Sequence, residues 1–337
     1  MWRWSVARVL ILHTGGTLGM RPRRPDRALA PDEFGPTLLE NVPELTTIAD
    51  VDTRVLFQLD SSDVHPEHWV RLGREIADSI ADYDGFVVTH GTDAMSYTAA
   101  ALSFLLRNPP VPIILTGSQR PLADARTDGR ANLVGAVDLA THEFREVCIY
   151  FDGLLLRGNR ARKRSSFAFS AFDSPNFPPL AEVGAGLRKI AEPLAPRGPF
   201  RLHGSFDPCV AVVRLLPGQP ASAWQALAGA GLRGLIVEAF GVGNLPVGDG
   251  SIGEALRHLI TRGVVLVVGS QAQKGRVDFG LYQGGRLAEQ IGALGADDMT
   301  PETASVKLMY LLGTLDDAKQ VKRAWHEPIA GELTAAE

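Results

Sequence analysis

The sequence predicts an α/β fold with two domains, and three observations support this prediction. The chain has 337 residues, more than one small core usually organises, so about two domains are expected. Short apolar runs that end in glycine or polar turns alternate with longer segments of helical periodicity, which is typical of a mostly parallel sheet flanked by helices. Hydrophobic residues make up 45% and charged residues 21%, the balance of a globular protein with a packed core.

The first part of the chain contains the longer series of alternating elements and is predicted to be the larger domain, residues 1–191. Strands are predicted over 6–12, 85–89, 111–116 and 147–151, with helices over 66–82, 94–107 and 131–141. Open α/β sheets bind ligands beyond the carboxyl ends of their strands. We therefore expect a functional site in the polar turns that follow these strands.

A connecting segment and a smaller α/β domain are predicted to follow. Residues 192–206 read EPLAPRGPFRLHGSF and have no regular period, which indicates a linker between the domains. Beyond it, residues 207–337 repeat the alternation, with strands predicted over 210–215, 235–240 and 264–269 and helices over 221–230, 252–261 and 302–312.

Composition disfavours several classes of protein. The net charge of −4 gives no electrostatic reason to expect nucleic acid or a membrane surface as a partner, so a small-molecule substrate is expected. No stretch reaches the roughly 20 apolar residues of a membrane span, and the short apolar run at the start lacks a cleavage site, so we expect a cytoplasmic protein. Cys148 and Cys209 both lie in apolar runs, which predicts buried free thiols.

Metal and serine-hydrolase chemistry have little support in the sequence. The histidines and cysteines show neither His-x-x-x-His nor Cys-x-x-Cys pairing, so no metal site and no cofactor are predicted. A Gly-x-Ser-x-Gly elbow is also absent, which argues against a serine nucleophile of the α/β-hydrolase kind.

Four polar segments remain as candidates for chemistry, and each also has a simpler structural explanation. TGGT at residues 14–17 follows the first strand and could be a plain turn or a phosphate loop, although it lacks the lysine of nucleotide loops. DSSD at residues 60–63 could cap the helix that begins near Pro66. HGTD at residues 90–93 could cap the next helix, and Lys163 lies in the basic run 157–164, which could be a solvated face.

Taken together, TGGT, DSSD, HGTD and RGNRxxK resemble the bacterial L-asparaginase family in order and spacing. The likeness continues through TGSQRPL at residues 116–122, GVGN at 241–244 and ADDMTPE at 296–302, so it covers nearly the whole chain. DSSD and the missing export signal are most similar to the type I, cytoplasmic branch. The resemblance implies a two-domain asparaginase-like fold.

The resemblance also implies roles for individual residues. Thr17 would be the nucleophile that attacks the substrate amide and forms a covalent acyl-enzyme, while Thr92, Asp93 and Lys163 would form a second polar group. Substrate-binding positions would be Gly16, Asp60, Ser61, Ser62, Gly91, Thr92 and Asp93, with the serines on the α-carboxylate and Asp93 on the α-ammonium group. Asn244 would reach the active site of a neighbouring subunit, which implies a homodimer or homotetramer.

The implied activity is hydrolysis of L-asparagine to L-aspartate and ammonia. L-Glutamine is a possible second substrate, because one methylene usually changes binding by only about 1–3 kcal/mol. Two alternatives remain open: a catalytically silent amino-acid sensor of the same fold, and the amidase subunit of a tRNA-dependent amidotransferase. The family's loop tyrosine has no counterpart in residues 21–31, so Tyr282 or Tyr310 is a candidate to activate Thr17 instead.

Overall fold

The computed structural model of this protein describes residues 6–22, 29–31 and 38–334, with no side-chain description for 20–31. The chain divides into two compact units, Met1–His203 and Gly204–Glu337. The loop that lacks the family tyrosine therefore lies mostly outside the described residues. Tyr282 and Tyr310 both belong to the second unit, where Tyr282 is exposed and Tyr310 is buried.

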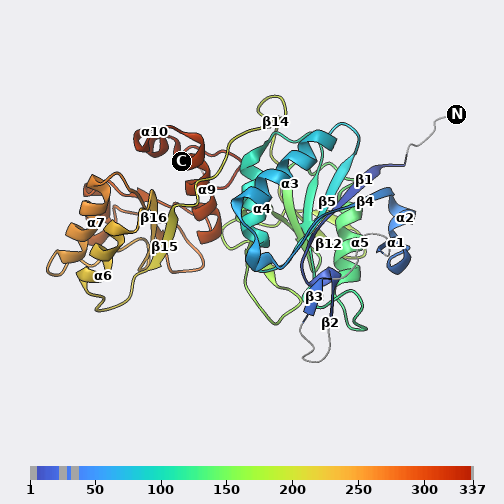
Figure 1. The fold of residues 1–337 in the computed structure, drawn as a ribbon, viewed down its shortest axis with the longest axis horizontal. Helices are drawn as coiled ribbons and strands as arrows, with labels where there is room; N and C mark the ends of the chain where they lie inside the picture. Colours follow the sequence, from blue (N-terminus) through green and yellow to red (C-terminus); the bar gives the residue numbers. More distant parts are fainter. Residues whose placement is uncertain (1–5, 23–28, 32–37, 335–337) are drawn as a thin grey trace. The chain divides into compact units, whose positions relative to one another are not determined.

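The first unit is built on a sheet that includes the labelled strands β1, β4, β5 and β12 (Figure 1). The sheet has eight strands in the order β13-β12-β9-β8-β7-β5-β1-β4. The predicted strands are confirmed as β1 (Arg8–Gly15), β5 (Gly85–Thr89), β7 (Ile113–Thr116) and β8 (Val147–Phe151). These strands run parallel to one another, and β4 (Asp50–Leu59) continues the parallel part beside β1. On the other side, β9 (Leu154–Arg157), β12 (Ala181–Val183) and β13 (Leu187–Lys189) are antiparallel.

Strand β4 was not predicted from the sequence. Its buried and exposed positions alternate irregularly, and charged side chains such as Asp50, Asp52 and Arg54 interrupt its apolar pattern. Such a pattern suits an edge strand, because only one side of it pairs with the sheet. Pairing with β1 makes it a strand, and the isolated sequence does not reveal that pairing.

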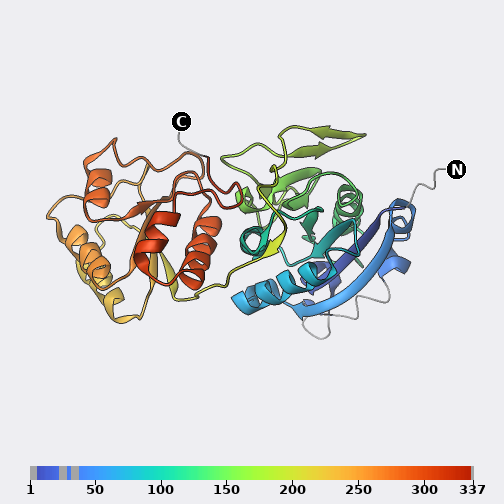
Figure 2. The same cartoon turned by 90° about the horizontal axis from the view of Figure 1, so that it is seen from above.

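Helices cover both faces of this sheet (Figures 1 and 2). The predicted helices are confirmed as α3 (Pro66–Ser79), α4 (Met95–Leu105) and α5 (Gly129–Leu139). One core joins Ile11, Val87 and Ile114 of the sheet to Leu133 of α5 and also includes side chains from the short helices α1 (Leu38–Asn41) and α2 (Leu45–Ile48). Because successive side chains of a strand point to opposite faces, alternate residues of the same strands face the other helices.

Among the described residues of the first unit, three short two-stranded ribbons accompany the sheet. They pair β2 (Met20–Pro22) with β3 (Leu29–Pro31), β10 (Arg162–Lys163) with β11 (Phe172–Asp173), and β6 (Leu106–Arg107) with β14 (Arg201–Leu202). The last pair places part of the predicted linker 192–206 within the first unit, because its backbone finds hydrogen-bond partners there.

The second unit is a smaller parallel sheet with helices. Its strands, in order, are β15 (Val210–Arg214), β16 (Gly234–Ala239), β17 (Val265–Ser270) and β18 (Leu294–Gly295). Its helices are α6 (Ala221–Gln225), α7 (Ser251–Thr261), α8 (Gln283–Gln290), α9 (Pro301–Thr314) and α10 (Ala318–Ala324). The predicted helix over 221–230 is shorter than expected, since its second half is a 3-10 turn that ends near glycines.

Side-chain exposure corrects one prediction and agrees with another. Cys148 is buried, whereas Cys209 is exposed immediately before β15, and both thiols are free. The prediction for Cys209 was wrong because β15 is an edge strand, which leaves part of an apolar run open to solvent.

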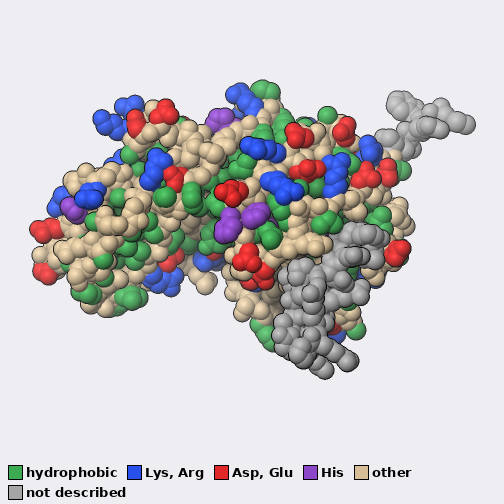
Figure 3. Space-filling view, viewed as in Figure 1, with side chains coloured by type: hydrophobic (Ala, Val, Ile, Leu, Met, Phe, Trp, Pro, Cys, Tyr) green, Lys and Arg blue, Asp and Glu red, His purple; other side chains and the backbone are tan. Residues whose placement is uncertain are grey.

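On the face drawn in Figure 3, acidic and basic side chains are interspersed over each unit. Among the described helices, none combines the length and apolarity needed to cross a bilayer.

Candidate active site

Two neighbouring strands bring the TGGT and HGTD segments together. Strands β1 and β5 are parallel and pair His13 with Thr89, so both segments follow at the same edge of the sheet. Gly16 has a φ of +84°, and a Cβ atom there would lie 2.4 Å from the backbone nitrogen of Gly91. Only glycine allows this approach, because any side chain would collide with backbone. Thr17, the next residue, is partly buried beside this contact.

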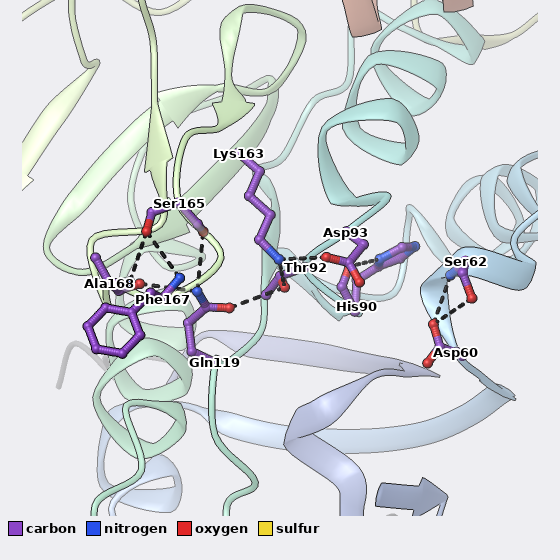
Figure 4. Close-up of polar contacts among 11 residues, drawn as sticks. Asp60, Ser62, His90, Thr92, Asp93, Gln119, Lys163, Ser165, Phe167 and Ala168 are labelled. Carbon is purple, nitrogen blue, oxygen red and sulfur yellow. Dashed lines mark hydrogen bonds and ion pairs between the residues drawn. The ribbon is translucent and has the colours of Figure 1, made fainter. Parts of the chain in front are cut away.

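The DSSD segment follows β4 at the same edge and packs onto HGTD. Ser61 is buried, and a Cβ atom on Gly91 would lie 2.5 Å from its Oγ. Asp60 accepts hydrogen bonds from the backbone nitrogen and the hydroxyl of Ser62, each at 2.9 Å (Figure 4). The prediction that this segment caps the helix at Pro66 was wrong, because His65 is the N-cap of that helix and Asp60 instead caps the short turn Ser61–Asp63.

Lys163 projects from β10 toward the HGTD segment, 70 residues away from Asp93 in the sequence. Its Nζ donates to Thr92 Oγ1 at 2.7 Å and to Asp93 Oδ1 at 2.6 Å (Figure 4). The lysine side chain is 19% exposed, whereas that of Asp93 is 71% exposed. The structure thus brings Thr92, Asp93 and Lys163 into one hydrogen-bonded group, with the carboxylate open to a ligand.

The basic run that contains Lys163 is not a solvated face. Arg157 is buried and forms an ion pair of 2.7 Å with buried Glu146. Arg160 is also buried, and both guanidinium groups lie over the ring of Phe177. These contacts fix the backbone just before Lys163, so the alternative explanation of this segment was wrong.

His90 locks the HGTD turn from inside the protein, a role that the sequence did not suggest. Its Nδ1 lies 2.7 Å from the carbonyl oxygen of Gly91, and its Nε2 lies 3.0 Å from Thr98 Oγ1. Since a carbonyl only accepts, Nδ1 carries the proton and Nε2 accepts from Thr98. Thr98 Oγ1 in turn accepts from Trp69 Nε1 at 3.0 Å. Every polar atom of the imidazole is therefore engaged in holding the backbone beside Thr92.

Both histidines near this edge are neutral at physiological pH. Burial lowers the pKa of His90 to about 4, against the opposing hydrogen bond to Gly91. Burial also lowers the pKa of His13 to about 4, with a further contribution from nearby His90. His13 hydrogen-bonds Thr89 at 2.7 Å. Neither imidazole is therefore a proton acceptor for a bound ligand, because each ring is buried and already bonded.

Asn244, the site residue predicted in the second unit, lies in a tight loop. The backbone nitrogen of Asn244 donates to the carbonyl oxygen of Phe240 at 2.8 Å. A Cβ atom on Gly284 would lie 2.2 Å from Asn244 Oδ1, so that glycine allows the loop to pack on α8. The contribution of Asn244 to the site of a neighbouring subunit stays a prediction.

The geometry of the first unit suits nucleophilic chemistry on a small polar substrate. It combines a hydroxyl on a glycine turn, a lysine that contacts a second hydroxyl and a carboxylate, and serines on an adjacent turn. Such a set can supply a nucleophile, a group that moves protons, and contacts for a charged ligand.

Comparison with known proteins identifies the family. Residues 8–194 match the family described as asparaginase, N-terminal, and residues 209–325 match the glutaminase/asparaginase C-terminal domain. The chain belongs to the asparaginase family. It is 36% identical to L-asparaginase 1 of Escherichia coli K12 over 97% of this chain and 98% of the relative, which places it with the type I branch.

Other members of the asparaginase family are similar in structure or in sequence. The structure of the thermostable L-asparaginase from Thermococcus kodakarensis is 33% identical, with a TM-score of 0.90 over 98% of this chain and 100% of that one. A glutamyl-tRNA(Gln) amidotransferase subunit of the same organism is 34% identical over 97% of this chain and 76% of its own length. The two-domain α/β architecture is therefore that of the family.

Proposed function

We propose that this asparaginase-family chain hydrolyses the side-chain amide of L-asparagine to L-aspartate and ammonia, with Thr17 as the nucleophile. The observation that carries the proposal is the hydrogen-bonded group of Lys163, Thr92 and Asp93 at the sheet edge where the backbone of Gly16 touches Gly91. The activity named for its relatives, E. coli L-asparaginase 1 among them, supports the same interpretation.

The first half of the reaction forms an ester on Thr17. A threonine hydroxyl is a weak nucleophile, so a positioned group must take its proton as it attacks the amide carbon. The developing oxyanion meets backbone N–H groups of the glycine turn and of the segment near Thr92, and each such donor is worth on the order of 3 kcal/mol. The C–N bond then breaks, and the amide nitrogen takes up a proton and leaves as ammonia.

The second half releases aspartate. A water molecule attacks the ester carbon, gives its proton to the polar group at Lys163 and Thr92, and that group returns a proton to the Thr17 oxygen as the C–O bond breaks. Lys163 suits this task because it is shielded from solvent and touches both Thr92 and Asp93. The hydroxyls of Thr17 and Thr92 and the amine of Lys163 thereby share the proton transfers of both steps.

The charged end of asparagine binds away from the reacting amide. Asp93 is the most exposed member of its group and carries the charge that attracts an α-ammonium group. Ser61 and Ser62 are the proposed partners of the α-carboxylate, and Asp60 fixes the Ser62 hydroxyl. Binding energy at this end orients the amide over Thr17 and converts binding into rate.

We place the enzyme in the cytoplasm as a homodimer or homotetramer, in which Asn244 of one subunit supports the site of another. L-Glutamine is a slower substrate, because its extra methylene displaces the amide from the nucleophile.

The test is ammonia release from L-asparagine by the parent chain and by Thr17→Ala. We expect the variant to lose at least about a thousandfold in rate while its thermal unfolding stays unchanged. Thr47→Ala is the matched control, because its hydroxyl only bonds the carbonyl oxygen of Glu44 on the surface. Equal ammonia release by the parent and Thr17→Ala would refute the proposed nucleophile.

A second function is favoured by the similarity to the amidotransferase subunit. Such a subunit would release ammonia for a tRNA-bound substrate, so asparagine hydrolysis by the chain alone would be slow and would rise when a partner and charged tRNA are added. A silent sensor would instead bind asparagine, as seen by calorimetry, and release no ammonia.

A further inference from the structure

Gln119 contacts Thr92 of the Thr92–Lys163 group from a turn beside HGTD. It follows β7, which lies beside β5 in the sheet. Its Oε1 accepts a long hydrogen bond of 3.4 Å from Thr92 Oγ1. Its Nε2 donates to the carbonyl oxygens of Ser165 at 3.3 Å and Ala168 at 3.1 Å (Figure 4).

The orientation of this amide follows from its partners. Two carbonyl oxygens can only accept, so the nitrogen of the Gln119 amide must face them. Its oxygen then faces Thr92 and acts as an acceptor. The turn that supplies the carbonyls is itself closed by Ser165 Oγ, which accepts from the backbone nitrogens of Phe167 at 3.1 Å and Ala168 at 2.9 Å.

The backbone of Gln119 is held from the opposite side. Asp128 accepts from the backbone nitrogen of Gln119 at 2.9 Å and from that of Arg120 at 3.1 Å. Asn132 donates to the Gly117 carbonyl at 3.0 Å and fixes the start of the same segment. The side chain therefore extends toward Thr92 from a rigid base, and it links that hydroxyl to the turn that follows Lys163.

The hydrogen-bond partners of Thr92 determine where its hydroxyl proton points. An N–H of Lys163 points at Thr92 Oγ1, which accepts the hydrogen bond. The single hydroxyl proton of Thr92 must then point elsewhere, and Gln119 Oε1 is the acceptor that the structure offers. With its proton held there, the threonine oxygen keeps a lone pair for the O–H of a water molecule or of the nucleophile.

We infer that Gln119 is a positioning residue, which directs the hydroxyl proton of Thr92 and holds the 165–168 turn against it. This inference rests on the proposed function, because the proton transfers at Thr92 are those of the proposed amide hydrolysis. It assigns Gln119 an effect on the rate of the bound complex rather than on substrate binding.

The first experiment measures ammonia release by Gln119→Met, which keeps the length of the side chain and removes all three of its side-chain hydrogen bonds. We expect kcat to fall about tenfold or more, while KM stays within about twofold, because the substrate contacts are untouched. Gln219→Met is the matched control, since that amide only accepts from the Leu216 backbone nitrogen in the second unit. We expect it to leave kcat and KM unchanged.

A second variant, Gln119→Glu, preserves the shape and tests the donor. It places a carboxylate oxygen against the two turn carbonyls, so we expect the turn to open and kcat to fall as well. Full kcat in either Gln119 variant would overturn the inference. A parallel fall of kcat and of the thermal unfolding temperature, with a raised KM, would also overturn it, because that result indicates a purely structural role.

A double-mutant cycle tests whether Gln119 acts through Thr92. Thr92→Ser keeps the hydroxyl but removes the methyl group that restricts the side-chain rotamer. We expect Gln119→Met to lower kcat by a larger factor in this background than in the parent. Equal factors would overturn the inference. A parent chain that releases no ammonia would overturn both proposals, whereas an active parent with an unaffected Gln119→Met would overturn only this one.

Discussion

Two lysine–carboxylate pairs of the same length occupy opposite environments in this protein. Lys163 and Asp93 lie 2.6 Å apart at the candidate active site, with side chains 19% and 71% exposed. Lys307 and Glu332 also lie 2.6 Å apart, within the second unit, and both side chains are 0% exposed. The contact is the same, so the surroundings must decide what each pair does.

The surroundings of the buried pair occupy its hydrogen-bonding groups. Lys307 also donates to the carbonyl oxygen of Glu327 and lies over the ring of Trp325. Glu332 accepts from the backbone nitrogens of Ile329 and Ala330. Burial lowers the pKa of Lys307, and the nearby Glu332 opposes that change. This pair fastens the C-terminal segment to α9 and is closed to a ligand.

The candidate-site pair is open by comparison. Asp93 projects its carboxylate to solvent, and Lys163 contacts a hydroxyl that has a proposed chemical role. An exposed ion pair adds little stability, because water and salt screen it. We therefore expect one pair to matter for rate and the other for stability.

The largest expected effect is on the rate, through Lys163→Met. We expect ammonia release from L-asparagine to fall by about 10²- to 10⁴-fold, the usual contribution of a group that moves protons. The unfolding temperature should stay close to that of the parent. A variant that unfolds easily yet retains its kcat would reverse the assignment of this pair.

The next effect is on stability, through Lys307→Met. Removing one partner leaves Glu332 buried and unpaired, which typically costs about 3–5 kcal/mol of unfolding free energy. Urea unfolding followed by tryptophan fluorescence and circular dichroism measures this loss. For the fraction that remains folded, kcat should equal that of the parent, and a stable variant with lowered kcat would contradict the comparison.

A smaller effect is the pH dependence of stability that results from the buried His90. The folded histidine loses its proton above about pH 4, whereas the unfolded one keeps it up to about pH 6.5. The folded state binds fewer protons in this window. The titration of His90 therefore leaves the unfolding free energy undiminished above about pH 6.5 and lowers it as the pH drops toward 4, by on the order of 3 kcal/mol. His13 acts in the same direction.

The measurement is urea unfolding at pH 7 and at about pH 4.5 for the parent and His90→Gln. We expect the loss of stability on acidification to be smaller in the variant. His258→Gln is the control, because that residue is exposed on α7 and its replacement should leave the loss unchanged. An equal loss in the parent and both variants would show that His90 does not contribute.

Much of the fold follows from local patterns. Strands β1, β5, β7 and β8 are continuous apolar runs that end in polar turns, so periodicity alone predicted them. Strand β4 was not predicted because charged residues interrupt its apolar pattern. Cys209 was wrongly predicted to be buried because an apolar run does not indicate which strand lies at a sheet edge. Edges are set by pairing between distant segments.

In the candidate site too, the sequence predicted some residues, whereas the roles of others were known only from the structure. Motif order nominated Thr17, Thr92, Asp93 and Lys163, because glycines, hydroxyls and a lysine at fixed places are visible in the sequence. His90 and Gln119 were visible in the same motifs, but nothing in them revealed that one would lock the turn from within and the other would reach Thr92.

Local sequence alone was enough to specify most of the strands and helices, the glycine turns and the family to which the chain belongs. These features depend on neighbours a few residues apart, such as apolar periodicity and the small size of Gly15 and Gly16. The folded chain was needed to show that Lys163 lies beside Thr92 and that one lysine–carboxylate pair is sealed while the other is open. Desolvation and hydrogen-bond partners explain this difference, because both are supplied by segments that are distant in sequence and meet only after folding.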